Sequence, residues 1–180
     1  MATANSSLRM TLAMDLDRVE ALSADLERVA EDQPAMPLMR ALVRLFKARV
    51  PHYHWVGIYL LEEGELRLGP YAGAPSPHTR IPLSQGICGA AARTGAALIV
   101  PDVRADERYL ACSLATRSEI VVPILNGAQV LGEIDIDSDH ASAFNEHDQA
   151  LLERAASFIA GAIARDPHSP RWAEPEPVGA

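Results

Sequence analysis

Apolar residues recur every three or four positions near both ends of the chain, the pattern of helices with one buried face. Two such stretches follow Asp15 and Pro34, and Pro51 ends the second because proline interrupts the hydrogen bonding of a helix. A third stretch follows Asn145, a residue suited to capping a helix N-terminus. The pattern therefore predicts helices at both ends of a folded unit.

The middle of the chain changes to strand-forming segments separated by turn residues. Residues 55–61 are rich in β-branched and aromatic side chains. Residues 119–124 and 129–137 flank Asn126-Gly127, a strong two-residue hairpin signal. We expect five or six strands joined by hairpins. The predicted fold class is α+β, a largely antiparallel sheet flanked by N- and C-terminal helices.

The length of 180 residues suits one domain, and no internal repeat or linker divides it. We expect a flexible arm over residues 1–14 and a single domain over residues 15–165. Residues 166–180 are proline-rich and nearly devoid of aliphatic side chains, which predicts a disordered tail.

The composition is that of an ordinary acidic globular protein, 48% hydrophobic and 22% charged, with a net charge of −8 and a pI near 5.2. This acidity argues against a nucleic-acid partner and against an anionic membrane surface. The sequence shows neither a long apolar run nor a secretory signal at its start, so we expect a cytoplasmic protein. It also lacks phosphate-binding, dinucleotide-binding and metal-ligand motifs, so we expect no cofactor and no metal.

The two cysteines, Cys88 and Cys112, are too few for a disulfide framework. They are either small buried hydrophobes or a redox pair, and their spacing alone does not decide. Cys88 precedes an alanine run with helical tendency, so it should lie near a helix N-terminus, where the dipole favours a thiolate. Cys112 lies in a loop-like segment that leads toward Glu119.

Carboxyl groups gather on one face of the predicted hairpin. Strand side chains alternate between faces, so Glu133, Asp135 and Asp137 should project together. Glu119 stands at the head of the neighbouring strand, close to the Cys112 segment. Such a group is either a solvated acidic face or a set of acids and bases for catalysis.

Trp55, Gly57 and Tyr59 should share one face of the first strand. In one interpretation both aromatic side chains belong to the core. In the other, the glycine between them opens a flat-walled slot for a ligand.

Several segments together resemble a known family. They are "HWVGIYL" at 54–60, "LGPYAG" at 68–73, "IPLSQGICG" at 81–89, "ACSLATRSEIVVPI" at 111–124 and "GEIDIDS" at 132–138. Their order and spacing are similar to those of the free methionine-(R)-sulfoxide reductases, which are stand-alone GAF-domain enzymes. The resemblance covers roughly residues 15–165 and implies a GAF-like fold and a homodimer.

The chemistry that this resemblance implies is thiol-dependent reduction of free L-methionine-(R)-sulfoxide. A cysteine thiolate attacks the sulfoxide sulfur, a protonated carboxyl gives a proton to the departing oxygen, and the enzyme is left as a sulfenic acid. A second cysteine then forms a disulfide, which thioredoxin or another dithiol reduces. By position, Cys112 matches the sulfenic-acid-forming cysteine of the family. The implied substrate-binding residues are Trp55, Tyr59, Glu119, Asp135 and Asp137, and Glu119 and Asp135 are the candidate acids.

Carboxylates close to a thiol should raise its pKa and disfavour the thiolate. The ammonium of the substrate would offset this effect. So would a proton shared between crowded carboxyl groups, which leaves one of them neutral and able to act as an acid.

The chain departs from the family pattern at several positions, of which two bear most on the chemistry. His78 lies about where the family carries a third cysteine, and Glu133 replaces a more usual apolar residue. Recycling would then fall to Cys88, which would resolve Cys112 directly, or to a small thiol. The alternative function is a non-catalytic GAF module for small-ligand binding or redox sensing. The enzyme requires Cys112 as a reactive thiol, whereas a ligand-binding module should tolerate Cys112→Ser.

Overall fold

The computed structural model describes residues 14–111, 113–166 and 174–179. Its helices are α2 (Leu16–Ala30), α3 (Ala35–Arg49), α4 (Gly86–Thr94) and α5 (Glu146–Arg165), with a short 3₁₀ helix at Val103–Ala105. Its strands are β1 (Trp55–Glu62), β2 (Glu65–Ala72), β3 (Arg80–Pro82), β4 (Leu98–Val100), β5 (Ser118–Asn126), β6 (Gln129–Ser138) and β7 (Glu176–Pro177). No helix in the described part is long and apolar enough to cross a membrane.

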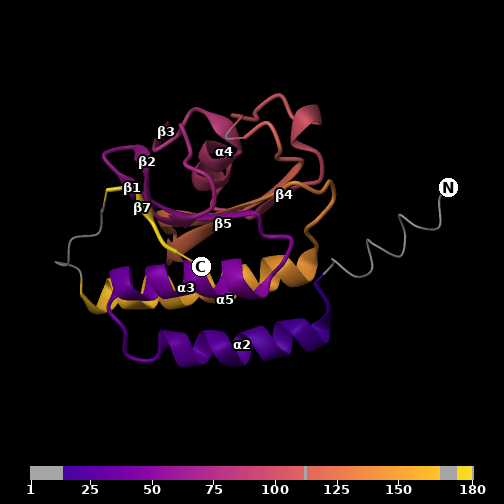
Figure 1. Ribbon diagram of the computed structural model, residues 1–180. Coiled ribbons are helices and arrows are strands. Elements are labelled where there is room, and N and C mark those ends of the chain that lie inside the picture. Colours follow the sequence, from indigo (N-terminus) through magenta and orange to yellow (C-terminus); the bar gives the residue numbers. More distant parts are fainter. Residues whose placement is uncertain (1–13, 112, 167–173, 180) are drawn as a thin grey trace.

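The strands form one sheet in the order β3-β2-β1-β6-β5-β4, and all neighbours on this path are antiparallel. Figure 1 shows the layers: α4 and the loops cover one face of the sheet, α3 and α5 cover the other, and α2 packs beyond them as an outer layer. The predicted α+β fold with an antiparallel sheet is confirmed.

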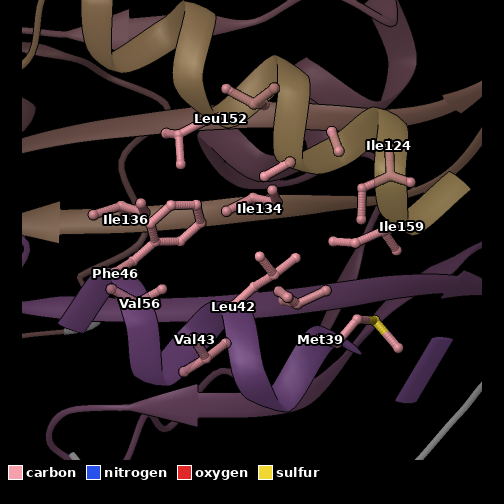
Figure 2. Close-up of a cluster of buried hydrophobic side chains, with 14 of the residues drawn as sticks. Met39, Leu42, Val43, Phe46, Val56, Ile124, Ile134, Ile136, Leu152 and Ile159 are labelled. Carbon is pink, nitrogen blue, oxygen red and sulfur yellow. The ribbon is translucent and has the colours of Figure 1, made fainter. Parts of the chain in front are cut away.

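Alternation along the strands separates two environments. Ile134 and Ile136 of β6 face the helices, where they join a large apolar core with α3 and α5 (Figure 2). Glu133, Asp135 and Asp137 occupy the alternate positions and therefore face α4. The same strand thus supplies an apolar core on one side and carboxyl groups on the other.

The last helix is held at its N-terminus by a buried polar cluster. The Asn145 side chain caps the helix and the Asp148 carboxylate accepts from the Asn145 backbone N–H, the reciprocal arrangement of a capping box. The Asp148 carboxylate also accepts from the Tyr53 hydroxyl at 2.8 Å. This contact fixes α5 to the residues that enter β1.

The structure changes two of the expectations for the backbone. Asn126 pairs with Gln129, so the two turn residues are Gly127 and the alanine after it. The turn thus lies one position later than predicted, and Gly127 has a φ of +60°. The prediction of a disordered tail is also wrong for the part of the tail that the structure describes, because β7 pairs in parallel with β2 and Val178 is buried. Strand pairing, the buried Val178 and an ion pair between Glu176 and Arg40 of α3, at 2.7 Å, hold this segment beside β2. The described part of the 1–14 arm, Met14, is buried as well.

Candidate active site

A thiol and two carboxyl groups meet on the α4 side of the sheet. Cys88 is the third residue of α4, and its Sγ lies 3.7 Å from Glu119 Oε1 on β5 and 3.5 Å from Asp135 Oδ2 on β6. All three side chains are buried. The sheet register explains the meeting, because β5 and β6 are paired neighbours and α4 packs on both of them.

Two further acids extend this cluster along β6. Asp137 pairs across the sheet with Glu119 and with Trp55, and it is 4% exposed. Glu133 is fully buried, and neither of its carboxyl oxygens has a hydrogen-bond partner among the described residues. Three of these buried carboxyl groups, those of Glu119, Glu133 and Asp135, therefore act on one thiol, and no Lys or Arg forms a salt bridge with any of the four acids in the described part of the chain.

Burial raises the pKa of every acid in this cluster. The pKa of Asp135 rises to about 7 because its carboxylate is desolvated. Desolvation, together with repulsion from Asp135, holds the pKa values of Glu119, Glu133 and Asp137 well above the usual range of a carboxyl group. At neutral pH the cluster therefore retains protons that exposed carboxyl groups would have lost. Its carboxyl groups can thus act as general acids.

The same surroundings overturn the prediction of a Cys88 thiolate. Desolvation raises the pKa of Cys88 well above its usual value, and Asp135, Glu133 and Glu119 raise it further. A helix N-terminus contributes about 0.3–1 kcal/mol to an anion, whereas burying an unpaired charge costs several kcal/mol. Burial and repulsion therefore outweigh the helix dipole, and Cys88 is a neutral thiol that donates to carboxyl oxygens. The expectation that nearby carboxylates raise a thiol pKa applies to this cysteine.

Aromatic side chains form the wall beside the carboxyl groups. The rings of Trp55 and Tyr71 are stacked with centroids 6.0 Å apart, and Tyr59 lies 6.4 Å from Trp55. The Trp55 indole N–H donates to the Ala74 carbonyl at 3.0 Å, and the Tyr59 hydroxyl donates to the His78 carbonyl at 2.9 Å. Both aromatic residues of β1 thus hold the loop that lies over the sheet.

The glycine slot is filled by the protein itself. A Cβ at Gly57 would overlap the six-membered ring of Trp55, so the indole lies directly over the glycine. A Cβ at Gly73 would come within 2.6 Å of the five-membered ring of the same indole. The space above Gly57 therefore positions Trp55 and is not open to a ligand, which corrects the slot hypothesis.

A Gly57→Ala substitution should displace the Trp55 indole, because the new methyl group has no other place to go. We expect overpacking to lower stability by about 1–3 kcal/mol and to change the substrate wall. Thermal unfolding and the KM for the substrate measure the two effects. Gly69→Ala is the control for replacing a strand glycine, since a Cβ there would meet only the Ile58 carbonyl oxygen, at 3.4 Å. An unchanged KM in Gly57→Ala would contradict this role of the glycine.

A cavity of about 220 Å³ opens beside this wall. It is lined by His54, Trp55, Ala74, Ser76, Ser113, Ala115, Thr116, Asp137 and Asp139. Asp137 belongs both to the cavity and to the acid cluster, so it links the open space to the buried carboxyl groups. Ser113 and Thr116 bring the segment that follows Cys112 to the rim of the same cavity.

The raised pKa values predict that stability falls as the pH rises. Asp135 has an ordinary pKa of 3.8 and a folded-state pKa of about 7, so between these values the folded protein binds more protons than the unfolded chain. Stability is therefore highest at the acid end of this window, and Asp135 alone removes on the order of 4 kcal/mol by its upper end. We expect a higher unfolding temperature at pH 5 than at pH 8, and a smaller difference in Asp135→Asn. Equal or greater stability at pH 8 would contradict the pKa shifts.

The structure brings together most of the predicted site. Cys88, Glu119, Asp135 and Asp137 lie in one cluster, with Trp55 and Tyr59 on the same face of the sheet. Cys112 lies outside the described residues, so its role stays a prediction.

Two contributors were missed, Tyr71 and Thr116. Alternation placed Glu133 on the face of Asp135, but it was not assigned to the site, where the structure buries it. Tyr71 and Thr116 carry no such sequence signal, since they reach the site through pairing and loop closure.

The fold and this arrangement define a GAF-domain protein, and the model of the GAF domain family matches residues 33–163. Free methionine-R-sulfoxide reductase of Escherichia coli is 33% identical over 120 residues, 67% of this chain and 72% of that protein. The structure of the Neisseria meningitidis free methionine-R-sulfoxide reductase in complex with its substrate is similar at a TM-score of 0.76 and 31% identity, over 83% of this chain and 89% of that one.

A type II free methionine-R-sulfoxide reductase from Thermoplasma acidophilum is similar at a TM-score of 0.70 and 37% identity, over 76% of this chain and 96% of that one. This chain belongs to the free methionine-R-sulfoxide reductase family.

Proposed function

We propose that the protein reduces free L-methionine-(R)-sulfoxide to methionine with electrons from a dithiol. The observation that carries this proposal is the group of buried, proton-retaining carboxyls beside an aromatic-walled cavity. A free amino acid offers an ammonium for such carboxyls, and a sulfoxide oxygen needs a proton when it leaves. The family membership supports the same activity.

The cavity suits a single amino acid. Its volume of about 220 Å³ lies below the roughly 300 Å³ at which pockets for drug-sized ligands begin. Asp137 lines it, and Glu119 lies beside Asp137 across the strand pair, so the substrate ammonium would bind there. Trp55 would contact the apolar side chain of the substrate. Binding of the ammonium would ionise the nearest carboxyl and leave Asp135 to supply a proton.

The proposed reaction proceeds in three steps. The Cys112 thiolate attacks the sulfoxide sulfur, the oxygen takes a proton from Asp135 or Glu119, and methionine leaves as Cys112 becomes a sulfenic acid. The Cys88 thiol then attacks the Cys112 sulfur, so that a disulfide forms and water leaves. An external dithiol such as thioredoxin reduces the disulfide to two thiols and becomes a disulfide itself. The carboxylate neighbours of Cys88 would accept its proton in the second step.

This scheme assigns recycling to the two cysteines of the chain, with His78 in place of a third. No metal or organic cofactor takes part in it. It requires a reducing environment, for which we propose the cytoplasm. A homodimer is also part of the proposal, because the family resemblance implies it, and light scattering of the purified protein tests it.

The test is release of methionine from resolved methionine-(R)-sulfoxide, measured with dithiothreitol and separately with a thioredoxin system. Release with both reductants is the expected result and would establish that two cysteines suffice. Release with dithiothreitol alone would retain the chemistry of Cys112 and reject the thioredoxin route. No release with either reductant would favour the ligand-binding module.

A further inference from the structure

We propose that the reduced site is also a metal site, in which Cys88, Glu119 and Asp135 bind a divalent transition-metal ion, with Zn²⁺ the best fit. The bound ion would block the reductase. Only this last consequence rests on the proposed function, because the binding itself can be measured without turnover.

The geometry of the three ligand atoms fits a tetrahedral ion. The sulfur and the two carboxyl oxygens all lie within 4.8 Å of one another, and the sulfur–oxygen distances are 3.7 and 3.5 Å. Zinc binds sulfur at about 2.3 Å and carboxylate oxygen at about 2.0–2.2 Å, which places sulfur and oxygen about 3.5–3.7 Å apart at the tetrahedral angle. Both sulfur–oxygen separations are therefore already close to those that Zn²⁺ requires, and the two oxygens lie within 4.8 Å of each other.

A second observation points to a ligand at this position. Glu133 is fully buried, and neither of its oxygens has a hydrogen-bond partner among the described residues. Asp135 Oδ1 is likewise without one. Glu133 lies two positions before Asp135 on the same strand face, and its carboxyl group raises the pKa of the Cys88 thiol. Buried polar atoms normally have partners, and a cation beside Cys88 would provide one for both acids.

The donor set selects the kind of ion. A thiolate is a poor ligand for Mg²⁺ and Ca²⁺, which prefer oxygen, whereas Zn²⁺ binds both sulfur and oxygen. The ion would displace the thiol proton and any protons on the coordinating carboxyls into solvent. Asp137 connects the cluster to the open cavity, which provides a route of entry. Because the substrate ammonium is proposed to bind these same acids, metal and substrate should exclude each other.

The first experiment measures metal binding by the purified reduced protein. Zn²⁺ affinity is obtained by competition with a chromogenic chelator, and Co²⁺ is used to detect a thiolate-to-metal charge-transfer band in the near ultraviolet. We expect one ion per chain and a band that Zn²⁺ abolishes. Cys88→Ala should remove the band and weaken Zn²⁺ binding by at least about 100-fold, given that loss of even an outer-shell partner costs 10- to 100-fold.

Matched variants separate this site from the others that the chain offers. Cys112→Ser should keep the band, which assigns the sulfur to Cys88. His140→Ala tests the pair formed by half-buried His54 and exposed His140, whose rings are 5.1 Å apart, and it should also keep the band. Glu119→Gln retains the thiol and should weaken binding, so the proposal remains testable if Cys88→Ala does not fold. Absence of the band in the wild type, or its persistence in Cys88→Ala, would overturn the proposal.

Inhibition is measured separately. Zn²⁺ should inhibit turnover competitively with methionine-(R)-sulfoxide, and a chelator should restore the rate. Binding to an enzyme whose turnover is not affected would reject the blocking role alone. A protein that binds Zn²⁺ and reduces no sulfoxide would leave the metal site established and the proposed function rejected.

Discussion

Replacement of Cys112 by serine should abolish methionine release completely. In the proposed reaction this thiolate is the group that takes oxygen from the substrate, and a serine hydroxyl is not ionised at neutral pH and is a far weaker nucleophile. Cys88 cannot take its place, because burial and three neighbouring carboxyl groups hold it as a neutral thiol. The measurement is methionine formed per chain in a single turnover without external reductant. Wild type should form one equivalent and Cys112→Ser none.

Cys88→Ser is the matched control, because it removes the other thiol by the same change. It should also form one equivalent of methionine, but it should stop as a sulfenic acid that dimedone traps, whereas wild type stops as a disulfide. A full equivalent from Cys112→Ser would reject the assignment of the nucleophile. Dimedone labelling of wild type and Cys88→Ser to the same extent would reject Cys88 as the resolving residue.

Asp135→Asn should lower kcat/KM by about 100- to 10,000-fold, the usual contribution of a positioned general acid. Asparagine keeps the shape of the side chain but has no acidic proton to give to the departing oxygen. The pKa of about 7 means that wild-type Asp135 is substantially protonated near neutrality, so the wild-type rate should fall as the pH rises through that value. In Asp135→Asn this limb of the pH profile should disappear. Steady-state kinetics between pH 5 and 9 measure both effects.

Stability provides the control for this variant. Removal of a carboxyl that is costly to ionise should leave Asp135→Asn as stable as wild type only below the ordinary pKa of 3.8, somewhat more stable than wild type at pH 5, and more stable still at pH 8. Loss of activity together with retained stability therefore separates a chemical role from misfolding. Asp17→Asn, an exposed acid on the outer helix α2, makes the same chemical change far from the site and should have no effect on kcat/KM. Unchanged kinetics in Asp135→Asn would reject its role as the acid.

The sequence by itself determined the elements and the faces of the sheet. Helical spacing, the Asn145 cap and the hairpin signal predicted the helices and the central strand pair, because these features depend on residues close together in the chain. Alternation placed Glu133, Asp135 and Asp137 on one face for the same reason. The family resemblance added Glu119, Trp55 and Tyr59, which the structure places on that face.

Only the tertiary structure decided the character of the site. Cys88 lies near a helix N-terminus, yet its pKa rises because α4 buries it against strands from distant parts of the chain. The space above Gly57 is filled by Trp55, and two residues of the tail pair with β2. Glu133 has no partner because of what packs around it and not because of its neighbours in the sequence. Desolvation, steric contact and strand pairing depend on residues that are close in space but distant in the chain. Local sequence patterns carry no information about those neighbours.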